Sequence, residues 1–403
     1  MSSDFVHRFW QRPRLHGEVL ASREVSFLEL FYDLVFVVVV ARAAHHLAQH
    51  PTWETTWQFA LIMMLVWLAW LNGSLYYELH SKNDGRTRTL IFVEMGILAL
   101  LAVYTADAVN GTPTGFALTY AAFLAFTSWH WVWIAKHDRP EYRVNALSTV
   151  GALLVGVVLM FASAWVGETA RLALWAAYAV LLLVGASRSF WRPSQALQRS
   201  IVSSASLVER FGLFTIIVLG EVVAGMVNGL GALDHPGVRT IATGMCAMAV
   251  GFAIWWLYFD LAGRQLPHDS PRPIGAYMYL HLPIAVAIAG AGAAVVSLIS
   301  HAQEDHTPPA TSWLLSGAYS LFLLTMAVLL RTLERFRLEP VAHRPVMALL
   351  VVAAVISLVA GWIAPAPWLL ALILVLASAL PWFAAARRWA FLPSDDAETP
   401  VAD

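Results

Sequence analysis

Charged residues are scarce in this 403-residue chain: they make up 13% of the sequence, whereas hydrophobic residues make up 59%. Soluble domains carry roughly a quarter charged residues, so this composition excludes an ordinary soluble fold. The apolar runs are long enough to cross a hydrocarbon core about 30 Å thick. The chain is therefore predicted to be an all-α integral membrane protein that crosses the bilayer many times and has lipid as its surroundings.

Other absences narrow the possible chemistry. The net charge is −1, so no basic field points to nucleic acid as a partner. The one cysteine, Cys246, excludes an internal disulfide and a thiolate metal site. No phosphate-binding glycine loop, HExxH or GxSxG motif is present. We therefore expect no cofactor, no metal and no catalytic residue. The arginine-rich first 25 residues lack an apolar core, so the first span is expected to direct insertion.

Twelve apolar segments can be marked along the chain. Backbone amides in hydrocarbon must bond within their own segment, so these segments are predicted to be helices. The predicted spans are 27–48, 57–79, 88–108, 114–135, 145–163, 171–187, 201–228, 240–263, 275–300, 312–330, 346–364 and 367–386.

The lysines and arginines test this map. Of 25 such residues, twenty-one fall before the first span or in every second loop after it, two fall in the opposite loops, and two lie within spans. Basic residues collect on the cytoplasmic side of a membrane protein. The split predicts the inner membrane, with a cytoplasmic N-terminal segment (1–26) and a cytoplasmic C-terminal tail (389–403).

The two halves of the chain show weak internal similarity. Residues 26–40 align with 206–220, 66–73 with 254–261, 91–97 with 278–284, and 143–147 with 344–349. The alignments keep a common order and place Glu29 on Glu209 and Glu94 on His281. They predict two parallel six-helix repeats, 27–200 and 201–388, related by a pseudo-twofold axis along the membrane normal.

Two carboxylates in the first span need an explanation. Glu29 and Asp33 are four residues apart, hence on one helical face, and they repel one another unless a cation lies between them. One alternative is a site that handles protons or cations. The other is a structural ion pair with Arg210 or with an arginine of a neighbouring loop.

Further ionisable residues lie inside later spans, where each needs a partner or a wet cavity. Glu94 and His281 form either a functional pair related by the repeat or two separately satisfied packing residues. Glu221 is too deep and too short to reach the interface, and nearby glycines leave room for a close helix or a ligand. Asp260 is either functional or pairs with Arg264.

Three stretches resemble the bacterial low-temperature-requirement A (LtrA) family: "ELFYDLVFV" (29–37), "ERFGLFTIIVLGE" (209–221), and "WWLYFD" (255–260) followed by "YLH" (279–281). The resemblance implies a multi-pass bacterial membrane protein linked to growth in the cold. The residues that match the family motifs are Glu29, Asp33, Glu209, Glu221, Asp260 and His281. The segment "YYELHSKNDGRTR" (76–88) departs from the Asn-Arg-Phe-Asp-like run of many members and indicates a variant subgroup.

Three functions compete at this point. A secondary transporter driven by protons or cations, with an unknown small solute, uses the repeat and the buried carboxylates. A channel, sensor or envelope-adaptation protein suits the link to cold growth. An intramembrane enzyme acting on lipid with metal assistance lacks close ligand spacings. The candidates for an ion, proton or substrate site are Glu29, Asp33, Glu94, Glu209, Glu221, Asp260 and His281. For a transporter, we expect all of them except Asp260 to converge on one water-accessible cavity.

Overall fold

A computed structural model describes residues 11–15, 25–82, 84–191 and 204–389. Most of the predicted terminal segments 1–26 and 389–403 therefore lies outside the described residues, as does the predicted boundary between the halves at 200/201. Within the described ranges the chain is helical and contains no strand, only an isolated β-bridge between Pro267 and Leu333. The all-helical class predicted from the sequence is confirmed.

A long helix lies at each of the twelve predicted spans. The helices of the first half are α2 (Phe27–Gln49), α3 (Trp53–His80), α4 (Gly85–Thr105), α5 (Pro113–His137), α6 (Pro140–Ser163) and α7 (Glu168–Trp191). Those of the second half are α9 (Ala205–Gly231), α10 (Val238–Leu261), α11 (Pro271–Ser300), α12 (Pro309–Leu329), α14 (Pro340–Ile363) and α15 (Pro367–Trp389). Two short elements, η1 (Leu330–Thr332) and α13 (Glu334–Leu338), join α12 to α14.

Ten of the described helices are long and apolar enough to cross a membrane, which supports a multi-pass membrane protein. The two long helices outside this set are α2 and α5. Helix α2 carries Glu29, Asp33 and Arg42, and α5 contains many aromatic and hydroxyl side chains. The number of twelve spans therefore stays a prediction.

Several helices begin earlier than the apolar runs that predicted them. Helices α6 and α11 start at Pro140 and Pro271, four or five residues before the predicted spans. Proline suits the first turn of a helix, because the amide hydrogen that it lacks would have no partner there. Side chains of Ser26, Thr52 and Asp84 cap α2, α3 and α4 in the same way that they cap helices of soluble proteins.

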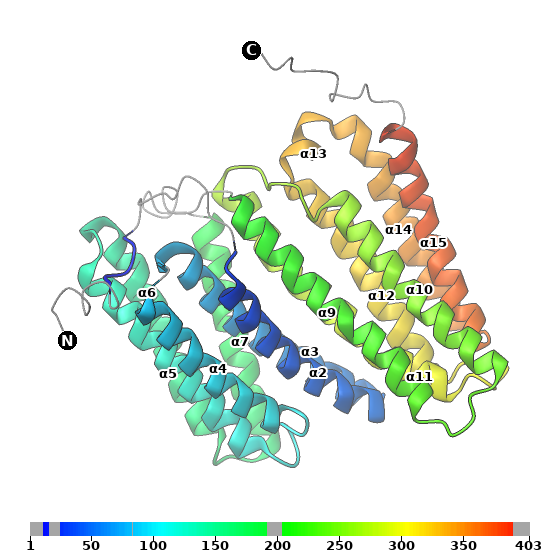
Figure 1. The fold of residues 1–403 in the computed structure, drawn as a ribbon, viewed down its shortest axis with the longest axis horizontal. Coiled ribbons are helices and arrows are strands. Elements are labelled where there is room, and N and C mark those ends of the chain that lie inside the picture. The colour runs from blue at the N-terminus through cyan, green and yellow to red at the C-terminus, as the bar shows by residue number, and fades with distance from the viewer. Residues whose placement is uncertain (1–10, 16–24, 83, 192–203, 390–403) are drawn as a thin grey trace.

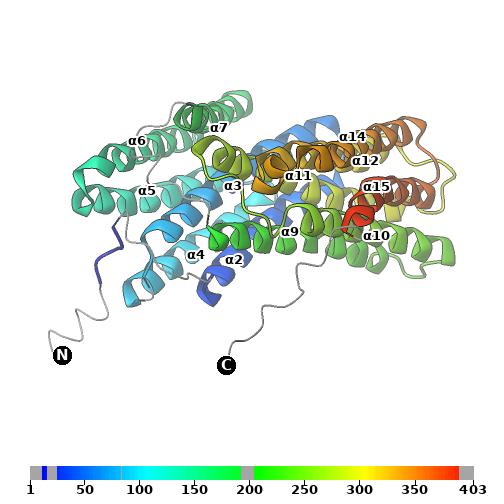
Figure 2. The ribbon, with the colours of Figure 1, turned by 90° about the horizontal axis from the view of Figure 1, so that it is seen from above.

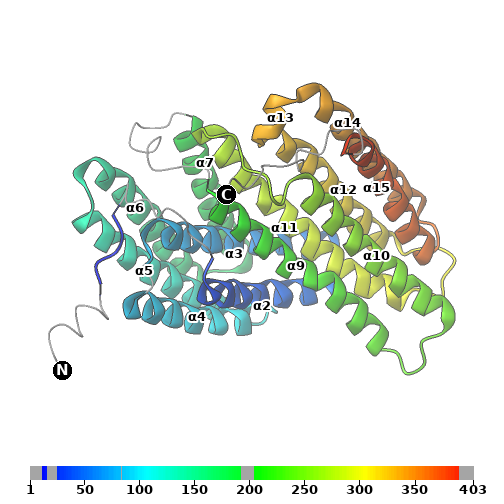
Figure 3. The ribbon, with the colours of Figure 1, turned by 45° about the horizontal axis from the view of Figure 1, so that its top comes forward.

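The helices lie side by side, and their spatial order from one edge of the molecule to the other is the same in all three views. Helices α4, α5 and α6 form one edge of the molecule, and α10 and α15 form the opposite edge (Figures 1, 2 and 3). Helices α2, α9 and α11 lie between these edges and pack against one another. The centre of the molecule is therefore built from both halves of the chain.

The same pairs of helices pack in each half. In the first half α2 contacts α3 and α4, α4 contacts α5, α5 contacts α6, α6 contacts α7, and α7 returns to α3. In the second half α9, α10, α11, α12, α14 and α15 make the corresponding set of contacts. Between the halves the packing is not symmetric, since α11 packs against α2, α3 and α7 whereas the corresponding contacts of α4 are at most slight among the described residues.

Candidate functional site

An arginine of the second half joins the two carboxylates of α2. Arg210 lies in the second turn of α9, and its Nη1 is 3.3 Å from Glu29 Oε2 while its Nη2 is 3.2 Å from Asp33 Oδ1. The two acids lie one helical turn apart on the same face of α2, so a single planar guanidinium reaches both. All three side chains are buried, and Asp33 is fully inaccessible. Of the two alternatives that the sequence left open, the ion pair with Arg210 is present.

The ion pair is only partly satisfied by its surroundings. The Trp70 indole donates to Asp33 Oδ1 at 2.8 Å, and Arg210 Nη1 also donates to the Ser74 carbonyl at 3.4 Å. Asp33 Oδ2 and Arg210 Nε have no hydrogen-bond partner among the described residues. Buried polar atoms without partners are uncommon because each costs about 1–3 kcal/mol. Asp33 Oδ2 is thus a buried acceptor that still lacks a donor.

Aromatic packing fixes this site between the halves. The Trp70 ring of α3 stacks on Phe214 of α9, with centroids 4.1 Å apart, and meets Phe211 edge-on at 5.3 Å. The residue that donates to Asp33 is thereby held by the same helix that supplies Arg210. We call Glu29, Asp33, Arg210 and Trp70 the inter-half site.

A second buried carboxylate, Glu94 of α4, lies in the first half. The Tyr77 hydroxyl donates to Glu94 Oε2 at 2.8 Å, and His130 Nδ1 of α5 is 3.3 Å from Glu94 Oε1. The Tyr77 ring contacts the ring of Tyr32 on α2, with centroids 5.6 Å apart. Tyr32 is the residue before Asp33. The tryptophans that flank His130 are typical of an interfacial belt, but the His130 side chain is buried and only 2% exposed. Glu94 therefore belongs to a hydrogen-bonded cluster in which Tyr77 also contacts Tyr32 of α2.

His281 occupies a separate position in the second half. Its Nδ1 is 2.7 Å from the Tyr277 carbonyl, and its Nε2 is 2.8 Å from the Tyr258 hydroxyl. A carbonyl only accepts, so Nδ1 carries a proton and Nε2 accepts from Tyr258 when the ring is neutral. Phe211 lies 4.6 Å from the His281 ring, between it and Trp70. Glu94 and His281, which the repeat aligns, each bond to a tyrosine of the preceding long helix but make no contact with each other in the described chain.

Glu221 lies on α9 where this helix approaches α11 most closely. A Cβ added to Gly292 would lie 2.7 Å from the backbone carbon and oxygen of Glu221, and one added to Gly225 would meet the Gly292 carbonyl. The expectation that a glycine here admits a close helix is therefore met at Gly225, whereas Gly220 has no neighbour within 4 Å. The Glu221 side chain is half-buried and makes no hydrogen bond within the described ranges.

The two remaining candidates lie apart from these clusters. Glu209 precedes Arg210 on α9 but is exposed. Asp260 accepts a hydrogen bond from the Trp382 indole of α15 at 3.1 Å, and this pairing differs from the expected one with Arg264. The seven candidates therefore do not meet in one place: Glu29 and Asp33 share the inter-half site, and the other five lie at separate positions.

A model of the bacterial low temperature requirement A protein (LtrA) family matches residues 24–380 of this sequence. The chain belongs to the LtrA family. It is also similar to an uncharacterized protein of Rhizobium meliloti (strain 1021), with 23% identity over 258 residues that cover 63% of this chain and 61% of the relative. The match thus spans about three-fifths of that relative's length. No solved structure matches the chain.

Residues 76–88, which are predicted from the sequence to differ from the family pattern, contribute contacts that hold residues 11–15. Arg14 Nε donates to the Leu79 carbonyl at 2.9 Å, the Arg14 guanidinium also donates to the Glu78 carbonyl, and the Arg14 carbonyl is 2.8 Å from His80 Nδ1. Asp84 accepts from the amide of Gln11 at 3.0 Å. Residues 76–88 therefore anchor residues 11–15 against the end of α3.

Two partners of the candidate residues, Trp70 and Tyr77, lie outside the LtrA motifs, and a third, Tyr258, lies within "WWLYFD" (255–260). Trp70, Tyr77 and Tyr258 look like ordinary members of aromatic belts, yet each donates its single polar hydrogen to a buried ionisable residue. The sequence contains one signal for two of these partners, because Trp70 and Tyr258 occupy the same position in the repeat alignment of 66–73 with 254–261.

Proposed function

We propose that this LtrA-family protein is a proton- or cation-coupled secondary transporter of a small solute in the bacterial inner membrane, and that Asp33 takes up the ion. One observation carries the proposal: Asp33 is fully buried between the halves, and its Oδ2 lacks a donor. A small cation at Oδ2 would supply the missing partner, and a proton there would instead neutralise the buried charge. The candidates do not converge on one cavity as expected for a transporter, so the proposal rests on Asp33 and its contacts alone and assigns no ion-binding role to the other carboxylates.

Ion uptake at Asp33 gives a direct physical route to a conformational change. Arg210 Nη2 is held by the negative charge of Asp33 at 3.2 Å. A proton or cation on Asp33 reduces this attraction and leaves Glu29 as the remaining acid on α2 that holds Arg210. A ligand shifts a conformational equilibrium when it binds the two states unequally. The strength of the contact between α2 and α9 therefore depends on whether the ion is bound.

The arrangement of the helices supports a duplicated transporter core. The halves 27–200 and 201–388 repeat the same pairs of packed helices, and the inter-half site takes its acids from one half and its arginine from the other. Duplicated transporters commonly place their ion sites where the repeats meet. The proposal includes cytoplasmic ends for both halves, on the basis of the lysine and arginine distribution.

The test is ion-driven charge movement in proteoliposomes adsorbed on a solid-supported membrane. We expect a proton or sodium jump to displace charge in the wild type and not in Asp33→Asn. Glu209→Gln is the matched control, because it neutralises an exposed carboxylate next to Arg210 and should keep the wild-type signal. A panel of small solutes under the same gradient then identifies the cargo by saturable current.

Two results would reject the proposal. Equal signals in Asp33→Asn and in the wild type would remove Asp33 from ion binding. Currents that grow linearly with ion concentration and need no solute would indicate a channel.

A further inference from the structure

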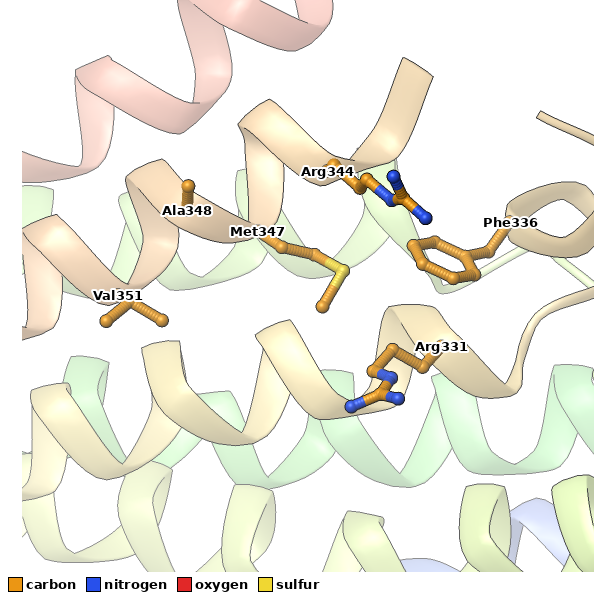
Figure 4. Close-up of a pocket in the computed structure, with 6 residues that line it drawn as sticks. All are labelled: Arg331, Phe336, Arg344, Met347, Ala348 and Val351. Atoms are coloured by element: carbon orange, nitrogen blue, oxygen red, sulfur yellow. The ribbon is translucent and has the colours of Figure 1, made fainter. Parts of the chain in front are cut away.

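A groove at one end of α12 and α14 lies far from the residues discussed so far. It has a volume of about 440 Å³ and is open to the outside. Its lining residues come from η1, α13 and α14: Arg331, Phe336, Arg344, Met347, Ala348 and Val351. Figure 4 shows the two arginines on opposite sides of the groove, with Phe336 and Met347 between them.

The charge in this groove has one sign. Arg331 and Arg344 are exposed, and neither makes a hydrogen bond or ion pair within the part of the chain that the structure describes. Glu334, a nearby acid, is instead directed toward His268, 4.0 Å away. Arg331 and Arg344 both line this groove, and a guanidinium group suits a phosphate because it presents a planar pair of donors to the phosphate oxygens.

An apolar track leads away from the arginines along α14. Ala348, Val351 and Val355 follow Arg344 at intervals of three or four residues, so they lie on one face of the helix. Val351 is 43% exposed and Val355 is 53% exposed. From Arg344 to Val355 the helix rises roughly 16 Å, which is about half the hydrocarbon thickness of a bilayer. The track therefore matches the depth of one leaflet.

The segment that closes the groove has the character of an interfacial element. Helix α13 has five residues, and Phe336 lines the groove while Leu338 is 72% exposed. Arg335 and Arg337 lie on the same short helix. Exposed apolar residues beside arginines are typical of a segment at the boundary between headgroups and acyl chains. The distribution of basic residues places this boundary on the cytoplasmic side.

We infer that this groove binds an anionic phospholipid of the cytoplasmic leaflet, with its phosphate between Arg331 and Arg344 and one acyl chain along Ala348 and Val351. Basic pockets between membrane helices on the cytoplasmic side are suited to anionic headgroups. A free phosphate would use the two arginines but would gain nothing from the apolar track. The occupant that uses both features is a lipid.

Native mass spectrometry of the full chain tests this inference. The protein is released from nanodiscs that contain equal amounts of phosphatidylglycerol and phosphatidylcholine, and retained lipids are counted. We expect the wild type to retain phosphatidylglycerol preferentially, and Arg331→Gln/Arg344→Gln to bind it about 30-fold more weakly. Arg335→Gln/Arg337→Gln removes the same charge from the neighbouring helix outside the groove and should keep the preference.

A steric variant separates the lipid from a free phosphate. Ala348→Trp fills the exposed track and leaves both arginines in place, so it should lower phosphatidylglycerol binding. Val227→Trp, at an exposed position of α9 that does not line the groove, is its control and should have no effect. Three results would overturn the inference: no preference in the wild type, equal loss in both arginine pairs, or inorganic phosphate displacing the lipid while Ala348→Trp binds it normally.

Discussion

Replacing Arg210 with methionine should destabilise the protein more than any other single change at the inter-half site. Methionine has a similar length but no charge, so Glu29 and Asp33 would face each other in a buried site without their shared guanidinium. Removing one partner of a buried ion pair costs about 3–5 kcal/mol. Because Arg210 serves two acids, we expect a loss near the upper end of this range in the free energy of unfolding.

Removing one of the acids should cost less. In Asp33→Asn, Arg210 keeps Glu29 as a partner and the new amide oxygen can still accept from Trp70. We therefore expect a loss of about 1–3 kcal/mol. Glu29→Gln/Asp33→Asn/Arg210→Met has no buried charge at these positions and should recover part of the stability lost in Arg210→Met. This ordering distinguishes a charge effect from a simple loss of packing.

The assay is equilibrium unfolding of purified variants in mixed micelles, with the free energy of unfolding compared at one micelle composition. Arg264→Met is the control, because Arg264 is exposed at the end of α10 and surface changes usually stay within about 0.5 kcal/mol. A loss below about 1 kcal/mol in Arg210→Met would refute the reasoning. So would a triple variant that is less stable than Arg210→Met.

Two further predictions concern contacts within the second half of the chain. Gly292→Ala should destabilise the protein by about 1–3 kcal/mol, because the added methyl would lie 2.7 Å from the Glu221 backbone. Gly220 has open space around it, so Gly220→Ala should stabilise α9 slightly. Thermal unfolding in detergent checks both, and equal effects would contradict the close crossing of α9 with α11. Tyr258→Phe should cost about 1–3 kcal/mol by leaving His281 Nε2 without its hydroxyl partner, and faster hydrogen exchange in α11 should accompany it.

The sequence predicted the helices well because hydropathy reports the part of each helix that must avoid water. Helix ends were predicted less well, since capping depends on single residues such as Thr52 and Asp84 that lie outside the apolar run. The short helix α13 was missed, because five residues with two arginines carry no hydropathy signal. Helix caps and the short helix α13 depend on hydrogen bonding, whereas hydropathy reports only depth in the membrane.

The candidate site was predicted only in part. Intramembrane acids are costly, so their positions could be found in the sequence, and Arg210 was available as a partner for Glu29 and Asp33. Which acids share a site depends on helix packing, which the apolar spans do not encode. Glu209 shows this limit, because its alignment with Glu29 predicted an equivalent role, yet it is exposed. Hydropathy therefore shows which buried residues need a partner, but it does not show which partner each residue has.

Helix α9 makes two contacts of different physical kinds. Near its start, Arg210 binds the acids of α2 by charge, and in its C-terminal half Gly225 packs against Gly292 of α11, backbone to backbone. The charge contact weakens when Asp33 gains a proton or cation, whereas the glycine contact does not depend on ionisation. Under the proposed function, α9 and α11 therefore stay together while their joint position against α2 changes. This places the moving boundary on the α2 side of α9 and α11.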